Sequence, residues 1–277
     1  MEIHVVQPGE TAYSIAQRYG ISTERLAADN GLREPFALAV GQALVILHPQ
    51  QVHTAAAGET PASIARAYGM PLAQLLRNNP TLAERLYPGQ TVVIRYPAPP
   101  LGPLEVNGYA YPSIGQGLLR QTLPYLSYLT LFTHGITRTG EVVDLNDSAA
   151  IAAALEYGVR PLMLLAAMDE GGAFNNLLAS DVLNNPAART ALVGSVTDTV
   201  LRKGYQGLDM DFEYVLPQDA EEYVALVREL SSALNPMGYP VFVALAPKTS
   251  TEQAGTAYEG HDYAGMGWAA NEVLVMT

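Results

Sequence analysis

The 277-residue sequence contains no cysteine, which excludes disulfide bonds and thiolate chemistry. Its five histidines are scattered without the spacing of metal ligands, and we expect neither a metal nor another cofactor. No apolar run is long enough for a membrane-spanning helix, and we expect none. The N-terminal segment MEIHVVQPGET lacks the basic and apolar regions of a secretory signal, so no signal peptide is expected either.

Basic residues are also scarce. The chain has 15 lysines and arginines against 27 aspartates and glutamates, a net charge of −12 that argues against a nucleic-acid partner. Residues 1–98 are neutral overall, so the negative charge lies entirely beyond them. With 49% hydrophobic residues, the chain can hold two or three domains with sizeable cores.

Three carboxylates, Asp209, Asp211 and Glu213, alternate with the apolar residues Met210 and Phe212. On a β-strand, alternate residues share one face, so the acids would point one way and the apolar side chains would pack behind them. Like charges this close cannot all ionise comfortably, and at least one proton should be held or shared. Such an arrangement suits an acid catalyst that works near neutral pH.

The spacing alone also fits an exposed acidic edge strand, or carboxylates that are paired with bases. The context favours catalysis, because residues 205–214 are too apolar for a solvated face and no lysine or arginine follows before Arg228. Unpaired acids on a buried strand are expensive, and this expense usually signals function. We therefore predict a catalytic site at this run.

The N-terminal part of the chain contains an internal repeat. HVVQPGETAYSIAQRYG at residues 4–20 aligns with HTAAAGETPASIARAYG at residues 53–69, and nine of 17 positions are identical. Each copy reads as strand, helix, helix, strand, and Thr11 and Thr60 are suited to cap the first helix of each copy. We predict one small βααβ domain at residues 1–48 and a second at residues 50–96.

Both copies closely resemble LysM domains, which bind glycans that contain N-acetylglucosamine. The resemblance rests on the Gly-Glu-Thr triplets, the Ser-Ile-Ala segments, Asn30 and Asn79, and the Gly-Gln pairs before the last strands. It implies a glycan groove between the first strand–helix loop and the loop before the last strand. The residues that it assigns to the groove are Gly9, Glu10, Thr11, Asp29, Asn30, Gly31, Gly58, Glu59, Thr60, Asn78, Asn79 and Pro80. Turn and cap roles are the alternative, and we expect most of these residues to serve both purposes.

A short proline-rich stretch at residues 97–103 reads as a stiff, extended linker. Beyond it, apolar strands alternate with amphipathic helices, a pattern that favours a parallel α/β sheet. The predicted strands are residues 106–111, 129–134, 160–167, 207–214, 241–246 and 272–276. The acidic run lies on the fourth strand, and active sites of such folds lie at the C-terminal ends of the strands.

Residues 104–277 resemble glycoside hydrolase family 18, whose fourth barrel strand carries the signature D-G-x-D-x-D-x-E. Here the segment is QGLDMDFE, with Gln206 in place of the first acid. The resemblance implies a TIM-type (β/α)8 barrel. It also implies that Glu213 protonates the leaving glycosidic oxygen, that Asp211 orients the acetamido group of the sugar, and that Asp209 shares a proton with Asp211.

The same resemblance implies a retaining, substrate-assisted mechanism, in which the acetamido oxygen of the sugar attacks its own anomeric carbon. It makes Tyr109 and Met276 candidate walls of the sugar subsite, although either fits plain barrel packing equally well. The region supplies six strands, whereas a full barrel has eight strands and about 250 residues. A six-stranded product would leave apolar edges bare, and we expect the sequence to be part of a longer chain.

Paired LysM modules before such a barrel resemble the spore peptidoglycan N-acetylglucosaminidases of endospore-forming bacteria. The leading hypothesis is therefore an enzyme that binds peptidoglycan and cleaves N-acetylglucosamine linkages in the spore cortex or its fragments. A glycan-binding protein with an inactive barrel and a chitinase are the alternatives. The missing signal favours a spore-associated protein over a secreted chitinase. The expected partners are peptidoglycan or chitin-type glycans, without nucleic acid or membrane, and protein partners are left open.

Overall fold

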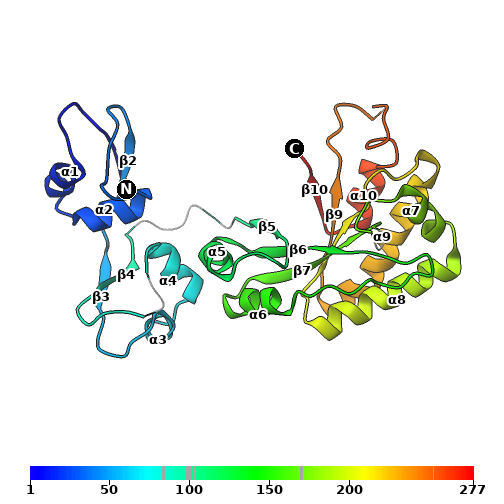
Figure 1. The fold of residues 1–277 in the computed structure, drawn as a ribbon, viewed down its shortest axis with the longest axis horizontal. Helices are drawn as coiled ribbons and strands as arrows, with labels where there is room; N and C mark the ends of the chain where they lie inside the picture. Colours follow the sequence, from blue (N-terminus) through cyan, green and yellow to red (C-terminus); the bar gives the residue numbers. More distant parts are fainter. Residues whose placement is uncertain (83–84, 98–101, 103, 169–170, 252) are drawn as a thin grey trace. The chain divides into compact units, whose positions relative to one another are not determined.

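The computed structural model describes residues 1–82, 85–97, 102, 104–168, 171–251 and 253–277. The chain forms two compact units, Met1–Leu104 and Glu105–Thr277, which run from blue to cyan and from green to red in Figure 1. Most of the predicted linker at residues 97–103 lies outside the described residues. No described helix is long and apolar enough to cross a membrane.

The first unit begins with a small βααβ module. Its elements are β1 (Glu2–Val5), α1 (Ala12–Tyr19), α2 (Thr23–Asn30) and β2 (Ala43–Ile46), and β1 pairs antiparallel with β2. Helix α1 begins at Thr11 because the Thr11 hydroxyl accepts the Ser14 N–H while the Ser14 hydroxyl accepts the Thr11 N–H. Ile15, Leu26 and Leu44 are buried between the helices and the sheet.

The second module repeats this design. It consists of β3 (Gln51–Thr54), α3 (Pro61–Ala67), α4 (Leu72–Asn78) and β4 (Thr91–Arg95), and β3 pairs antiparallel with β4. Thr60 and Ser63 form the same reciprocal cap, and Pro61 occupies the first position of the helix, where a missing N–H does no harm. The predicted pair of βααβ folds is confirmed.

Asn30 and Asn79 tie the second helix of each module to its last strand. The Asn30 amide donates to the carbonyls of Leu26 (2.9 Å) and Val45 (2.8 Å), and its oxygen accepts the Val45 N–H (2.7 Å). Asn79 makes the equivalent bonds to Leu75 (2.9 Å) and to Val93 (2.7 and 2.8 Å). Both amides are fully engaged by the protein framework.

Asn79→Ala should lower the free energy of unfolding of the second module by about 3 kcal/mol, because the substitution removes three hydrogen bonds and leaves strand groups unpaired. Asn30→Ala is the matched change in the first module. Thermal unfolding followed by circular dichroism measures both, with exposed Gln51→Ala as the control. An unfolding midpoint of Asn79→Ala equal to that of the control would contradict the prediction.

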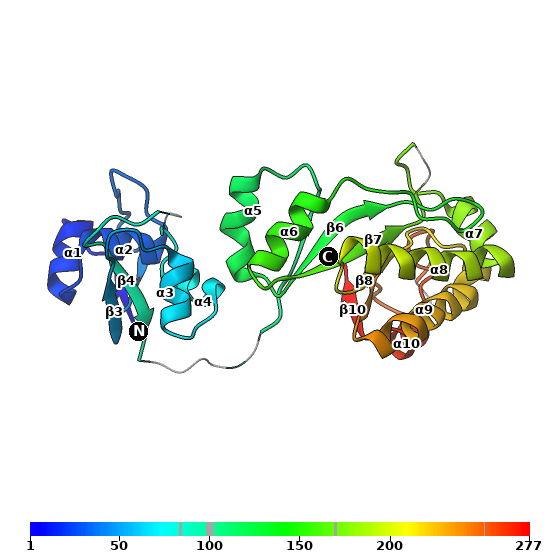
Figure 2. The same cartoon turned by 90° about the horizontal axis from the view of Figure 1, so that it is seen from below.

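The second unit is built on a six-stranded parallel sheet with the spatial order β10-β9-β8-β7-β6-β5 (Figures 1 and 2). Its strands are β5 (Asn107–Ala110), β6 (Tyr128–His134), β7 (Arg160–Ala166), β8 (Leu208–Asp211), β9 (Val241–Leu245) and β10 (Glu272–Val275). Each strand pairs in parallel with the next strand along the chain, as in a TIM barrel. The six strands form a half-barrel, as the sequence predicted.

Helices connect the strands of the half-barrel. They are α5 (Gln116–Thr122), α6 (Ser148–Glu156), α7 (Asn176–Leu183), α8 (Pro186–Lys203), α9 (Ala220–Leu234) and α10 (Tyr263–Ala269), with short 3₁₀ turns at Leu123–Tyr125, Pro217–Asp219 and Asn235–Met237. One large hydrophobic core joins these helices to alternate residues of the strands, such as Met163 and Leu165 on β7 and Val241 and Val243 on β9. The other residues of each strand therefore face the opposite, inner side of the sheet.

The fourth strand is shorter than the sequence predicted. Residues 207–214 were expected to be extended, but the hydrogen-bonded strand β8 ends at Asp211, and Glu213 lies in the turn that follows. The apolar alternation continues to Phe212, which explains why the sequence predicted a longer strand. An apolar pattern does not specify where strand pairing stops: β9 pairs with β8 through Met210 and β7 pairs with it through Asp211.

Candidate functional site

Strand β8 divides its side chains between the core and the inner face of the half-barrel. Met210 and Phe212 are completely buried in the hydrophobic core. Asp209 and Asp211 occupy the alternate positions and are also buried, with 0% and 6% exposure. Glu213 follows in the turn and is partly exposed. The local sequence thus places three carboxyl groups at the C-terminal end of one central strand.

Asp209 lies deepest and is held by hydroxyl groups from β5 and β6, two strands farther along the sheet. Its Oδ2 accepts a hydrogen bond from the Tyr109 hydroxyl on β5 (2.7 Å) and lies 3.2 Å from the Thr130 hydroxyl on β6. Within the described part of the chain, Oδ1 of Asp209 and Oδ1 of Asp211 are buried without a hydrogen-bond partner. Such atoms call for a proton or a ligand, because an unpaired buried oxygen is costly.

The three carboxyl groups all favour the protonated form more than free acids do. Burial raises the pKa of Asp209 to about 6, against the opposing effect of the hydrogen bonds from Tyr109 and Thr130. Burial raises the pKa of Asp211 to about 7, and the charges of Glu213 and Asp209 add to this effect. Burial also raises the pKa of Glu213. The site can therefore hold protons near neutral pH, as an acid catalyst must.

The backbone between Asp211 and Glu213 is held by side chains instead of by a strand. The Phe212 N–H donates to the Tyr223 hydroxyl (3.3 Å), and Nε2 of His261 lies 3.0 Å from the Phe212 carbonyl oxygen. The Ala246 N–H donates to Nδ1 of His261 (3.0 Å), so Nε2 carries the hydrogen. The Tyr223 ring also stacks on Phe212, with centroids 5.3 Å apart.

Neither of these two supports of the site, Tyr223 and His261, was predicted from the sequence. Each residue approaches β8 from a different part of the chain, so no local spacing links either of them to the acidic run. Burial lowers the pKa of His261, which keeps the imidazole neutral and its two hydrogen bonds intact.

The acids open onto a cleft of about 460 Å³. Tyr109 and Met276, the two predicted walls, both line it together with Asp211 and Glu213. The remaining lining residues are Ala110, Tyr111, Phe132, Ala244, Leu274 and Thr277. The aromatic pair Tyr111 and Phe132, in edge contact at 5.3 Å, was not predicted. Aromatic walls above carboxyl groups suit a sugar ring, which has apolar faces and polar edges.

A second cavity, of about 350 Å³, lies in the first βααβ module. Glu10 and Thr11, two of the residues predicted to bind glycan, line it. The facing loop consists of Pro35, Phe36, Ala37 and Leu38, and Ala12, Tyr13 and Thr23 complete the lining. The predicted loop at residues 29–31 does not contribute to this groove, so the loop before the last strand takes part through residues nearer that strand.

The other residues of the predicted grooves build the loops around them. The Glu10 carboxylate accepts the Gln7 N–H (2.8 Å) and contacts His4 (2.7 Å) and Arg18 (2.8 Å), and Glu59 repeats the first two contacts with Ala56 and His53. Gly9 and Gly58 adopt φ values of 83° and 84°, and Gly31 adopts 62° at the end of α2, all unfavourable for other residues. Thr60 caps α3, Asn78 donates to the Ile94 carbonyl, and Pro80 is exposed.

Comparison with known proteins identifies the two parts of the chain. The family model of the LysM domain matches residues 4–47 and 53–95, and that of glycosyl hydrolases family 18 matches residues 163–277. The chain carries two LysM domains and a family 18 glycosyl hydrolase domain. The resemblance deduced from the repeat and from the acidic run is thereby confirmed.

The relatives include cortical fragment-lytic enzymes and a spore cortex-lytic enzyme. The chain is 35% identical over 285 residues to the cortical fragment-lytic enzyme of Bacillus subtilis (strain 168), and 33% identical over 291 residues to that of Bacillus anthracis. It matches the crystal structure of the spore cortex-lytic enzyme SleL of Bacillus megaterium QM B1551 with a TM-score of 0.74 at 30% identity, over 99% of this chain. In all three cases the chain spans 65% of the length of the relative.

A metal site was not expected from the sequence. Among the described residues, no group of three or more histidine, aspartate or glutamate side chains is arranged to hold a metal ion.

Asp211→Asn should stabilise the barrel unit at pH 8 and leave its stability unchanged at pH 4. The pKa of Asp211 is about 7 in the folded protein and about 4 in an unfolded chain, so the folded state binds this proton more tightly. The resulting stability is present below pH 4 and is lost as the pH rises through 7. Removing the carboxyl group removes this loss, which is on the order of 3 kcal/mol.

Unfolding of the barrel unit by urea at pH 4, 6 and 8 tests this expectation. Exposed Asp198→Asn is the matched control and should follow the wild type at each pH. Equal stability of Asp211→Asn and the wild type at pH 8 would show that the Asp211 carboxyl group is not destabilised by its site.

Proposed function

We propose that the protein cleaves N-acetylglucosamine linkages in spore cortex peptidoglycan or its fragments by a retaining, substrate-assisted mechanism. The observation that carries the proposal is the set of three carboxyl groups with raised proton affinity, of which Asp211 and Glu213 line an aromatic cleft and Asp209 is buried beside them. The names of the relatives support the substrate, since they describe lysis of spore cortex and of cortical fragments. A spore-associated location follows from the same substrate.

Glu213 is the proton donor in this proposal. It is the most accessible of the three acids, it lines the cleft, and burial raises its pKa. Its proton passes to the glycosidic oxygen as the bond from that oxygen to the anomeric carbon breaks. The acetamido oxygen of the same sugar forms a new bond to the anomeric carbon on the opposite face. Water then displaces this oxygen and returns a proton to Glu213, so the configuration at the anomeric carbon is retained.

Asp211 and Asp209 stabilise the positive charge that develops on the sugar. Asp211 lines the cleft next to Glu213 and accepts the acetamido N–H, which aligns the attacking oxygen. Asp209 lies behind it, out of reach of substrate, and is fixed by Tyr109. A proton shared by the two aspartates satisfies their unpaired oxygens before substrate binds, and its movement to Asp209 leaves Asp211 charged when the sugar becomes positive.

The LysM pair holds the enzyme on the polymer. The groove of the first module combines carboxylate and hydroxyl groups from Glu10 and Thr11 with the aromatic rings of Tyr13 and Phe36. This mixture of polar groups and aromatic faces fits the edges and faces of a sugar ring. Two linked modules on one polymeric glycan increase the retention of the chain through their effective concentration.

Glu213→Gln should reduce the release of reducing N-acetylglucosamine ends from cortex fragments by about 10²–10⁴-fold, since the amide cannot donate the proton. Binding to insoluble peptidoglycan should be unchanged. Reducing-end assays and pull-down measure the two properties, with exposed Glu221→Gln as the control. Full activity of Glu213→Gln would refute the assignment of the acid. A wild-type chain that binds glycan without cleaving it would favour a binding protein, and preferential cleavage of chitin would favour a chitinase.

Tyr13→Ala should weaken peptidoglycan binding about fivefold, a loss of roughly 1 kcal/mol, because one aromatic wall of the first groove is removed. Tyr13 is 63% exposed and its counterpart in the second module is Ala62, so the change imitates a residue that the repeat already tolerates. Isothermal binding to soluble peptidoglycan fragments measures the effect. Tyr125→Ala in the barrel unit is the control, and an equal affinity of the two variants would contradict a role of the groove.

A further inference from the structure

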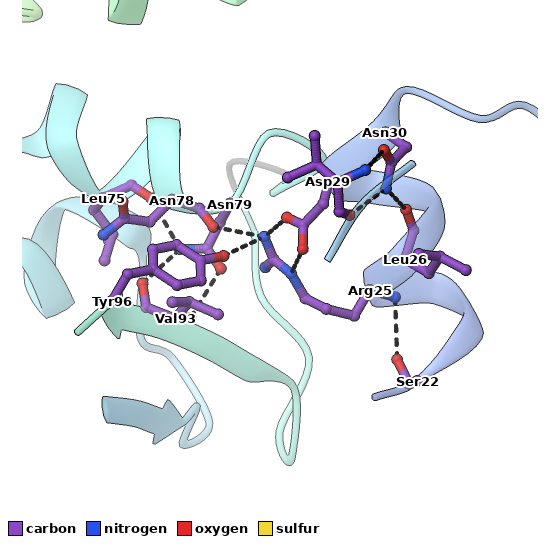
Figure 3. A network of polar contacts seen from close by, with 11 residues as sticks. Ser22, Arg25, Leu26, Asp29, Asn30, Leu75, Asn78, Asn79, Val93 and Tyr96 are labelled. Atoms are coloured by element: carbon purple, nitrogen blue, oxygen red, sulfur yellow. Dashed lines mark hydrogen bonds and ion pairs between the residues drawn. The ribbon is translucent and has the colours of Figure 1, made fainter. Parts of the chain in front are cut away.

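Arg25 on helix α2 of the first LysM module contacts the second module (Figure 3). Nε of Arg25 donates to Oδ2 of Asp29 (2.9 Å), and its Nη2 contacts the other oxygen of the same carboxylate. This Nη2 also donates to the Asn78 carbonyl oxygen (3.0 Å) and to the Tyr96 hydroxyl (2.7 Å) of the second module. The guanidinium carbon lies 5.9 Å from the centre of the Tyr96 ring.

The junction is shielded from water. The side chains of Arg25 and Asp29 are only 17% and 3% exposed. Burial raises the pKa of Tyr96 to about 12, so its hydroxyl is intact at neutral pH. A two-pronged arginine–carboxylate pair in such a setting has a defined geometry, unlike a surface ion pair. The guanidinium is therefore held rigidly by Asp29 while it binds the other module.

The internal repeat shows that this pair is special to the first module. With the offset of the repeat, Arg25 corresponds to Gln74 and Asp29 to Asn78. In the second module, the Gln74 amide donates to the Asn78 side-chain oxygen (3.1 Å), which is the uncharged form of the same contact along a helix. The charged pair occurs in the module whose arginine also contacts the neighbouring module. The second module makes this contact along its helix with the uncharged pair alone.

The chain between the modules is also short. Strand β2 ends at Ile46 and β3 begins at Gln51, which leaves four residues, including Pro49, to connect them. A connection of this length restricts the relative positions of the modules but does not fix their rotation. The contacts of Arg25 supply the missing constraint, since they join α2 of the first module to the end of α4 and to the residue after β4 of the second.

We propose that Arg25 locks the two LysM modules into one rigid body, so that their grooves form a single bivalent site that selects extended glycan chains over short oligosaccharides. The glycan part of this inference rests on the binding role proposed above for the LysM pair. A rigid pair presents both grooves at one fixed separation and orientation, so the second groove binds the same polymer without a further loss of rotational freedom. A short oligosaccharide fills one groove and gains nothing.

Asp29 and Asn78 thereby take a role different from the one that the family resemblance suggested. Both were expected among the glycan-binding residues. Asp29 is nearly inaccessible and its carboxylate is occupied by Arg25, while the Asn78 carbonyl accepts a hydrogen bond from that arginine. We assign both residues to the junction between the modules, where they act on the glycan only by positioning the grooves.

The test is a double variant, Arg25→Gln with Asp29→Asn, which gives the first module the uncharged pair of the second. Because the second module folds with that pair, the variant keeps the helix contact and loses only the bridge. Residual dipolar couplings of the full chain measure the relative orientation of the modules. One alignment tensor should describe both modules in the wild type, and two tensors should be needed in the variant.

Glycan binding supplies the second measurement. The variant should bind chitopentaose as the wild type does, within about twofold, and should bind insoluble peptidoglycan about tenfold more weakly. Tyr96→Phe, which removes one contact across the junction, should show a smaller loss of the same kind. Arg66→Gln, on an exposed face of α3, removes the same charge and should behave as the wild type.

Three outcomes decide the matter. A double variant that keeps one tensor and full affinity for peptidoglycan overturns the proposal. Equal weakening for chitopentaose and for peptidoglycan also overturns it, because the groove itself would then depend on Arg25. If the tensors separate while even the wild type binds neither glycan, the rigid pair is supported and the proposed glycan-binding role of the modules fails.

Discussion

The period of two residues along strand β8 is the constraint on which the site depends. Met210 and Phe212 must enter the hydrophobic core, and Asp209 and Asp211 are thereby forced onto the inner face. Because β8 is paired on both sides, by β7 and by β9, a slip of one residue would place carboxylates in the core and is strongly disfavoured. Packing of the apolar side chains therefore keeps the acids in a position that is unfavourable for the acids themselves.

This position is unfavourable for the charged acids and useful for catalysis for the same reason. Burial raises the pKa of all three carboxyl groups, so protons remain at the site near neutral pH. The strand ladder ends at Asp211, and Glu213 needs another support. Stacking of Tyr223 on Phe212 and the neutral imidazole of His261 provide it, which links the placement of Glu213 to the packing of α9.

Much of this architecture could be predicted because it depends on local patterns. The repeat revealed both βααβ modules, and the apolar alternation revealed the strands. The alternate spacing predicted that Asp209, Asp211 and Glu213 lie together, and Asp211 and Glu213 line the cleft. Contacts between distant segments carry no such pattern. Tyr111 and Phe132 meet only when β5 and β6 lie side by side, and the first groove uses residues 35–38 because the loop folds back on Glu10 and Thr11.

The junction between the LysM modules shows a subtler limit of sequence analysis. Arg25 and Asp29 stand four residues apart on a helix, and a local ion pair accounts for them fully. Because the local ion pair explains both residues, the sequence gives no reason to expect the contacts of Arg25 with Asn78 and Tyr96, which are 53 and 71 residues away. The informative signal was the difference between the two copies, charged in one and uncharged in the other. Where a repeat keeps a contact but changes its chemistry, the change points to what only one copy must touch.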